Sequence, residues 1–217
     1  MAIPRLLLDT LLPAACPVCG RPGAAPCRSC WLLLRPAPPG PVPRGLDGCR
    51  SLLAYEGVGR ELVARLKYRN ARSAVAWLAA GMAGLVARST AAGSIDVVTW
   101  APTTAQRRRR RGFDQAELLA RDLARELVVP CAARLWRGPG PPQTGRSRAE
   151  RWHGPTFAPR RGPPGGDSRV LLVDDLLTTG ATLTAAAGTL RAAGAATIHA
   201  VTAGRTPLKV VATGADP

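Results

Sequence analysis

The fold of this chain is decided by the stretch Val170-Leu171-Leu172-Val173-Asp174-Asp175-Leu176-Leu177-Thr178-Thr179-Gly180-Ala181-Thr182. Its four leading apolar residues are typical of a central parallel strand that is covered on both faces. Asp174 and Asp175 follow directly, and open α/β sheets bind ligands beyond the carboxyl ends of their strands. The stretch therefore predicts a ligand site at the end of a buried strand.

The residues after the strand offer the chemistry of a sugar-phosphate site. Ionised Asp174 and Asp175 accept hydrogen bonds from the hydroxyls of a ribose, or bind a divalent cation. The following turn adds hydroxyl donors, a glycine that allows close approach, and the first amides of a helix, all of which suit a phosphate. These turn residues are Thr178, Thr179, Gly180, Ala181 and Thr182.

The whole stretch resembles the phosphoribosyl-pyrophosphate (PRPP) motif of the type I phosphoribosyltransferases. The resemblance implies that the two aspartates bind the ribose hydroxyls and that residues 178–182 bind the 5′-phosphate. A structural turn would not need two adjacent acids, which repel each other unless a cation or donors compensate. The first strand of a receiver domain also ends in paired aspartates, but it requires a further aspartate after a later strand, and only Asp216 follows here.

Two Cys-x-x-Cys pairs near the start of the chain have the spacing of a metal site. Seven residues separate the pairs, which consist of Cys16 with Cys19 and Cys27 with Cys30. Four thiolates would close a tetrahedral zinc site and leave no position for water, so the predicted role is structural. The alternatives are a redox pair or a disulfide. Cys49 and Cys131 have no such spacing and are interpreted as ordinary buried thiols.

A proline-rich stretch divides the chain into three predicted segments. We expect a zinc module with a short amphipathic helix at Leu6 to Leu12 in residues 1–35, a stiff linker in residues 36–48, and a phosphoribosyltransferase-like domain in residues 49–217. Hydrophobic periodicity predicts an α/β domain with a parallel sheet. The expected strands lie at 51–55, 95–100, 170–173 and 197–202, and the expected helices at 59–68, 73–88 and 181–193, with a further helix after Asp114.

The chain is strongly basic, with a net charge of +16, and only Lys67 and Lys209 of its 30 basic residues are lysines. Five arginines are expected in the loop after the predicted strand 95–100, where a pyrophosphate would lie in a phosphoribosyltransferase. A solvated basic turn or a nucleic-acid patch is the alternative, and a coding bias would explain the scarcity of lysine but not the excess of positive charge. The candidate leaving-group contacts are Lys67, Arg107, Arg108, Arg109, Arg110 and Arg111.

A second stretch, together with the cysteines, resembles a smaller family within the phosphoribosyltransferases. Residues 111–120, Arg-Gly-Phe-Asp-Gln-Ala-Glu-Leu-Leu-Ala, together with the upstream cysteines, resemble the ComF family, which is known from bacterial competence and DNA uptake and is related to GntX. Segments 55–68 and 143–157 also resemble that family, the latter as its mobile loop. Asp114, Arg146 and Gly154 depart from its usual asparagine, leucine and asparagine. Trp152, His153 and Phe157 belong to this expected lid.

The resemblance implies displacement of pyrophosphate from PRPP by a nucleophile, with Mg²⁺ and the arginines stabilising the departing charge. No residue pattern identifies the acceptor. The alternative function is a non-enzymatic module that binds PRPP or single-stranded DNA and contacts DNA-uptake proteins. No apolar run reaches the length of a membrane span, and Asp9 and Pro13 argue against a lipoprotein signal ending at Cys16, so a cytoplasmic protein is expected.

Overall fold

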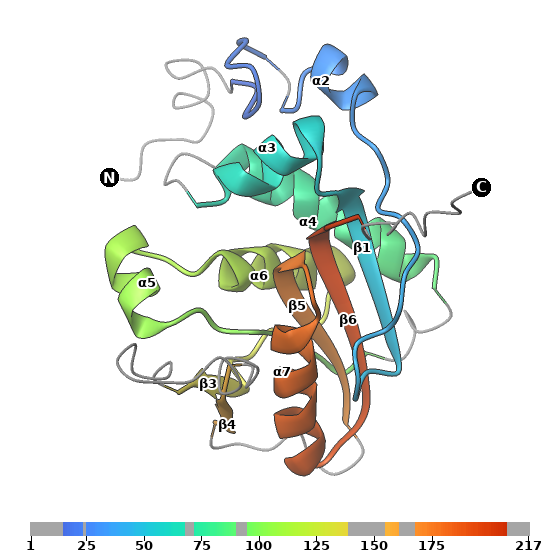
Figure 1. Cartoon of the computed structure of the whole chain (residues 1–217), viewed down its shortest axis with the longest axis vertical. Coiled ribbons are helices and arrows are strands. Elements are labelled where there is room, and N and C mark those ends of the chain that lie inside the picture. Colours follow the sequence, from blue (N-terminus) through green and yellow to red (C-terminus); the bar gives the residue numbers. More distant parts are fainter. Residues whose placement is uncertain are drawn as a thin grey trace, which may run out of the picture.

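The structure is a computed structural model that describes residues 15–23, 25–67, 72–89, 95–138, 155–160 and 168–207. Within these ranges, a mostly parallel sheet is flanked by helices (Figure 1). The strands are β1 (Gly48–Ala54), β2 (Val97–Trp100), β3 (Leu135–Arg137), β4 (Phe157–Pro159), β5 (Ser168–Leu177) and β6 (Ala195–Arg205). The helices are α2 (Arg28–Leu32), α3 (Gly57–Arg65), α4 (Arg72–Ala87), α5 (Ala105–Arg111), α6 (Gln115–Leu127) and α7 (Ala181–Ala192).

The main sheet has the order β1-β6-β5-β2, and every neighbouring pair is parallel. On one face, α4 and α6 bury a core that includes Leu78, Leu119 and Leu171. On the other face, α7 packs Leu183 and Leu190 against the same sheet. The central strand β5 is buried between these two layers, which explains its continuous run of apolar residues. The predicted α/β fold with a parallel sheet is therefore confirmed.

Most predicted elements lie where periodicity placed them, but two of them differ. Strand β5 continues through both aspartates to Leu177, because Asp174 and Leu176 still pair with β6. The arginine run forms the short helix α5, not a loop. The side chain of Thr104 accepts a hydrogen bond from Arg107 N (3.3 Å) at the start of α5, and Gly112 ends it in a left-handed conformation (φ 82°).

The proline-rich residues 36–48, called the strap from here on, pack against the domain. Figure 1 shows the strap running from α2 along the sheet to the start of β1. Next to it, Ala54 N donates to Arg35 O (2.9 Å), while Ala37 N donates to Leu52 O (3.1 Å) and adds an antiparallel partner at the edge of β1. Farther along, Pro41 O accepts from the guanidinium of Arg205 (2.7 Å).

The end of the strap is tied to α7 and β6. The Asp47 carboxylate accepts from the Arg191 guanidinium (2.7 Å) and from Ile198 N (2.6 Å). The strap also reaches the opposite end of α7, because a Cβ placed on Gly180 would lie 3.0 Å from the Pro43 ring. The chain between the cysteine cluster and β1 thus contacts both ends of the helix that follows the paired aspartates.

The cysteine-bearing segment packs on the domain through a small cluster of its own. Cys16, Cys27 and Cys30 are buried, and Val18 and Val58 pack against them. Since Val58 belongs to α3, the segment contacts the main domain directly. The helix expected at Leu6 to Leu12 lies outside the described residues. None of the helices in the described part of the chain combines the length and apolarity that crossing a membrane requires.

Candidate functional site

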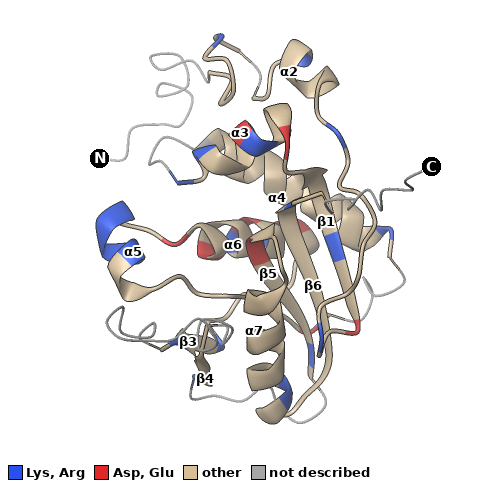
Figure 2. Cartoon of the chain, in the orientation of Figure 1, with Lys and Arg blue, Asp and Glu red and all other residues tan. Residues whose placement is uncertain are grey.

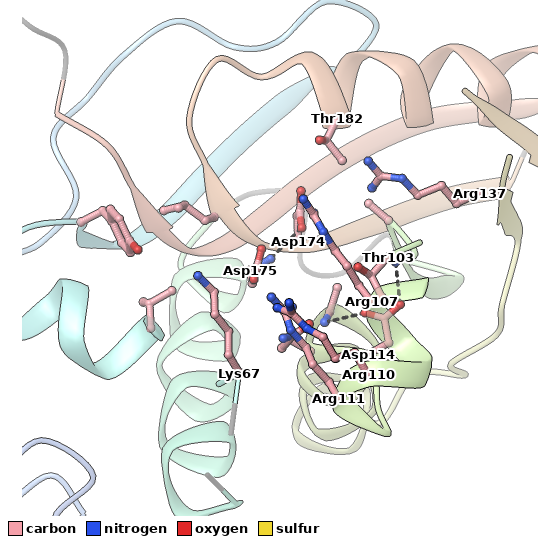
Figure 3. Close-up of a pocket in the computed structure, with 16 residues that line it drawn as sticks. Lys67, Thr103, Arg107, Arg110, Arg111, Asp114, Arg137, Asp174, Asp175 and Thr182 are labelled. Carbon is pink, nitrogen blue, oxygen red and sulfur yellow. Dashed lines mark hydrogen bonds between the residues drawn. The ribbon is translucent and has the colours of Figure 1, made fainter. Parts of the chain in front are cut away.

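A cavity of about 360 Å³, called the inner cavity here, lies beyond the carboxyl ends of β2 and β5 (Figure 3). Helix α5 and the end of β3 close its sides, and α3 and Lys67 lie across from them. The residues that line it are mostly polar or charged. They are Tyr55, Val63, Lys67, Ala101, Thr103, Arg107, Arg110, Arg111, Asp114, Gln115, Ala116, Arg137, Asp174, Asp175, Leu176 and Thr182.

The two aspartates of β5 both line this cavity but differ in burial. Asp174 is only 8% exposed, whereas Asp175 is half-buried. Among the described residues, the one hydrogen bond to the Asp174 carboxylate comes from Asp175 N (2.8 Å). Burial, followed by repulsion from Asp175, holds the pKa of Asp174 well above its usual range. A ligand that supplies hydroxyl donors or a cation would relieve this penalty.

The turn after β5 begins helix α7 next to these carboxylates. Gly180 adopts a left-handed conformation (φ 81°) at the N-cap, and Thr179 Oγ1 accepts from Ala181 N (3.4 Å). Thr182 lines the inner cavity, whereas Thr178, Thr179 and Ala181 are exposed beside it. The free amides of the first helical turn can bind an anion here.

We expect Gly180→Ala to destabilise the chain by about 1–3 kcal/mol, because a Cβ there has both an unfavourable φ and a close contact with Pro43. Gly188→Ala on the same helix is the matched control. It meets nothing within 4 Å, so it is expected to be neutral or to stabilise α7 by up to about 1 kcal/mol. Urea unfolding of both variants measures the difference, and equal effects would contradict the assigned strain.

Helix α5 divides the five predicted arginines. Arg107, Arg110 and Arg111 line the inner cavity, at the spacing that places side chains on one face of a helix. Arg108 instead pairs with Glu117 (3.5 Å), and Arg109 lines neither this cavity nor the second one described below. Figure 2 shows the resulting concentration of positive charge on α5, facing the acidic end of β5. Lys67 lies near Asp175 at the opposite wall (Figure 3).

Arg137 is a site residue that the sequence did not indicate. It ends β3, its guanidinium donates to Pro102 O (3.2 Å), and it lies over the Phe157 ring at 5.5 Å. Burial and the nearby Arg107 lower the pKa of Arg137. Its guanidinium points toward Thr182 in Figure 3. A lone arginine in a short strand carries no signal, because only the pairing of β3 with β4 fixes its direction.

Asp114 and Gln115 are two further buried polar residues in this wall. Asp114 is 4% exposed and accepts from Thr103 N (2.7 Å) and Ala116 N (3.1 Å). Asp114 thus caps α6, the helix predicted to follow it, and burial raises the pKa of Asp114. Gln115 Nε2 is buried without a hydrogen-bond partner among the described residues. An unpaired buried donor is unusual in a folded protein, and it lines the cavity where a polar ligand could accept from it.

The four predicted cysteine ligands form a second candidate site. Their Sγ atoms all lie within 4.8 Å of one another, and Cys19 Sγ is 3.7 Å from Cys27 Sγ. A tetrahedral zinc site with bonds of about 2.3 Å has sulfur–sulfur edges of about 3.8 Å. Cys16, Cys19, Cys27 and Cys30 are therefore arranged to bind one metal ion, and no disulfide joins the described cysteines.

The predicted lid can be placed only at its end. Residues 143–154, with Trp152 and His153, lie outside the described residues. Phe157 begins β4 and packs against the core on the α7 side of the sheet. Phe157 is thus an apolar anchor at the end of this segment.

The chain matches a known domain family and is similar to a known protein. Residues 111–209 match the phosphoribosyl transferase domain family. The competence protein ComFC of Bacillus subtilis is 29% identical over 179 residues, which cover 77% of this chain and 68% of ComFC.

Two solved structures are also similar. A glutamine PRPP amidotransferase from B. subtilis aligns with a TM-score of 0.44 and 20% identity over 64% of this chain, which spans 30% of that enzyme's length. Adenine phosphoribosyltransferase from Leishmania donovani aligns with a TM-score of 0.42 and 15% identity, over 82% of this chain and 80% of that one. The chain thus has a phosphoribosyltransferase-type fold in its matched domain, is similar to ComFC over most of its length, and carries a four-cysteine cluster ahead of that domain.

Proposed function

We propose that the inner cavity binds PRPP with Mg²⁺ and transfers its phosphoribosyl group to an acceptor. One observation carries this proposal: the paired aspartates of β5, the start of α7 and three arginines of α5 line a single cavity. In this arrangement, Asp174 and Asp175 accept from the ribose hydroxyls. Residues 178–182 hold the 5′-phosphate at the helix start. Arg107, Arg110 and Arg111 contact the pyrophosphate.

The proposed reaction is a substitution at C1 of the ribose. The lone pair of the acceptor forms the new bond to C1, and the electrons of the broken C1–oxygen bond leave with pyrophosphate. Negative charge therefore grows where Arg107, Arg110 and Arg111 converge, and preorganised cations stabilise such charge most effectively away from water. Lys67 and Arg137 add positive charge at two further walls of the cavity.

The residues at the end of β5 fit a magnesium ion. Two adjacent carboxylates are hard oxygen ligands, and the ionised form of Asp174 lacks a compensating positive partner among its hydrogen bonds. When bound there, Mg²⁺ neutralises charge on the pyrophosphate and orients it. The chain's own residues hold the ribose and the pyrophosphate so that the acceptor can reach C1 from the side opposite the breaking C1–oxygen bond.

The similarity to ComFC and the cysteine cluster support further parts of the proposal. We propose that the cluster binds zinc in a structural role, since four thiolates leave no open position. We also propose a role in competence, because the chain is similar to a protein named for that process. A link to DNA uptake and a location in the cytoplasm stay predictions from the sequence. Binding without turnover is the alternative function, and both versions use the same cavity.

Replacement of Arg107 and Arg110 together by alanine is expected to weaken Mg²⁺-PRPP binding by about 10-fold for each arginine, because each removes a hydrogen bond to a charged group. Arg109→Ala on the same helix is the matched control, since it lines neither cavity. Calorimetry on the full chain measures both affinities.

Release of pyrophosphate with a panel of nucleobases then separates the two versions of the function. Turnover with any base supports the transferase, and tight binding without release supports the binding module. Undetectable PRPP binding by folded wild-type protein would overturn both versions.

A further inference from the structure

A second cavity, called the outer cavity here, has a volume of about 390 Å³ and lies behind one wall of the inner cavity. The two cavities share Thr103, Asp114 and Arg137. The volume falls within the range of small-ligand sites. Beyond the shared wall, its aromatic and charged residues are Trp100, Trp136, Arg108, Arg121, Arg160 and Glu117.

Strand β3 borders both cavities: Arg137 lines the two of them, whereas Trp136 lines only the outer cavity. Successive residues of a strand point to opposite faces, so Arg137 and Trp136 diverge. Trp136 is 56% exposed although it is large and apolar, and its cross-strand partner Ala158 is too small to cover it. The Arg160 guanidinium lies 3.5 Å from the ring centroid. Since Arg160 covers one face of the indole, the opposite face and the ring edges provide the open surface.

The charges around this tryptophan favour an anion. Glu117 is shared by Arg108 (3.5 Å) and Arg121 (2.8 Å), so one carboxylate serves two guanidinium groups. Arg160 Nε is buried with no hydrogen-bond partner among the described residues. Neutralisation within the outer cavity is therefore incomplete, and donors remain for a negatively charged group.

We propose that the outer cavity binds a nucleotide, with its base on the open face of Trp136 and its phosphate among Arg108, Arg121 and Arg160. A flat indole beside convergent guanidinium groups matches a base joined to a phosphate, because bases stack on aromatic rings and arginine binds phosphate through its planar fork. A free nucleoside monophosphate and one unit of a single strand share this chemistry. The site goes beyond the proposed transferase function, since it requires no PRPP.

The test titrates the full chain with adenosine and thymidine monophosphates, with a short single-stranded oligonucleotide, and separately with Mg²⁺-PRPP and inorganic phosphate. Trp136→Ala is expected to weaken nucleotide binding by about 5- to 150-fold, the usual effect of losing one stacking ring. Mg²⁺-PRPP binding should stay unchanged. Trp31→Ala is the matched control, because Trp31 is similarly exposed (54%) on α2 and lines neither cavity.

A second pair of variants tests the phosphate contact. Arg108→Glu is expected to weaken nucleotide binding more than Arg109→Glu, although the two make the same charge change on the same helix. Saturable binding of monophosphates would support the site with a free nucleotide as its source. Binding of the oligonucleotide alone, still sensitive to Trp136→Ala, would support it with a strand as the source.

Three results would overturn the proposal. The first is that neither the nucleoside monophosphates nor the oligonucleotide bind. The second is that Trp136→Ala and Trp31→Ala have equal effects on nucleotide binding. The third is that nucleotide binding is lost only in the Arg107/Arg110 variant. Failure of Mg²⁺-PRPP to bind while nucleotides still do would count against the transferase proposal alone.

Discussion

Asp174→Asn is expected to weaken Mg²⁺-PRPP binding by about 10- to 150-fold while raising the thermal stability of the ligand-free chain. The loss follows from replacing a charged acceptor of ribose hydroxyls, since a hydrogen bond to a charged group contributes about 1.5–3 kcal/mol. The gain follows from removing a buried charge that burial and Asp175 both disfavour. For a chain of this length, each kcal/mol relieved raises Tm by about 2–4 °C.

The stability gain has a definite pH dependence. The folded-state pKa of Asp174 lies above its unfolded value of about 3.9, so ionisation destabilises the ligand-free folded state as pH rises through the folded pKa. Below the unfolded pKa the residue is protonated in both states, and this penalty disappears. The difference in Tm between Asp174→Asn and wild type should therefore widen as pH rises from acidic values to neutrality.

Scanning calorimetry across this pH range, with and without Mg²⁺-PRPP, measures both effects. Asp122→Asn is the control, because Asp122 lies on the surface of α6 and pairs only with Arg125 among the described residues. A Tm difference that does not change with pH would contradict the assigned burial penalty. Retained affinity for Mg²⁺-PRPP would remove Asp174 from the binding site.

Cys30→Ser is expected to reduce the bound metal from about one ion per chain to nearly none, since zinc requires all four thiolates to close its coordination sphere. In small zinc-finger peptides, zinc binding contributes about 10–16 kcal/mol to the free energy of folding. In the described part of the chain, Val18 and Val58 are the only other residues packed into this cluster. The segment around Cys16 to Cys30 should therefore become susceptible to proteolysis, which mass spectrometry of the fragments would show.

Cys49→Ser is the matched control for metal content. Burial raises the pKa of Cys49 to about 11, so it stays protonated at neutral pH and is a poor metal ligand. Mg²⁺-PRPP binding should persist in both variants, because none of the four clustered cysteines lines the inner cavity. An unchanged metal content in Cys30→Ser would refute the four-thiolate site.

The sequence predicted the parts of the site that are contiguous in the chain. The strand, the paired aspartates and the turn of residues 170–182 form one local unit, and the spacing of the cysteines by itself indicates a four-residue cluster. Arg137 could not be predicted, because its direction depends on pairing between β3 and β4 across a long loop. Gln115 was similarly hidden, since its unpaired amide is evident only once the cavity wall is formed.

The arginine run shows how local periodicity can be missed in a uniform sequence. Five identical residues have no amphipathic pattern, so nothing in Arg107 to Arg111 distinguishes a loop from a helix. The signals for α5 lie in its flanking residues, Thr104 and Gly112, which cap the two ends. In the helix, the 3.6-residue turn directs different arginines of the run to different cavities.

The strap also protects the sheet. β1 is an edge strand, and a bare edge presents unpaired backbone groups that can recruit a strand from another molecule. Arg35 and Ala37 occupy that position, through the hydrogen bonds that Ala54 N donates to Arg35 O and Ala37 N donates to Leu52 O. Prolines in the same stretch lack the amide hydrogen needed to extend the pairing outward. The segment that joins the cysteine cluster to the domain therefore also hinders edge-to-edge pairing of sheets between copies of the chain.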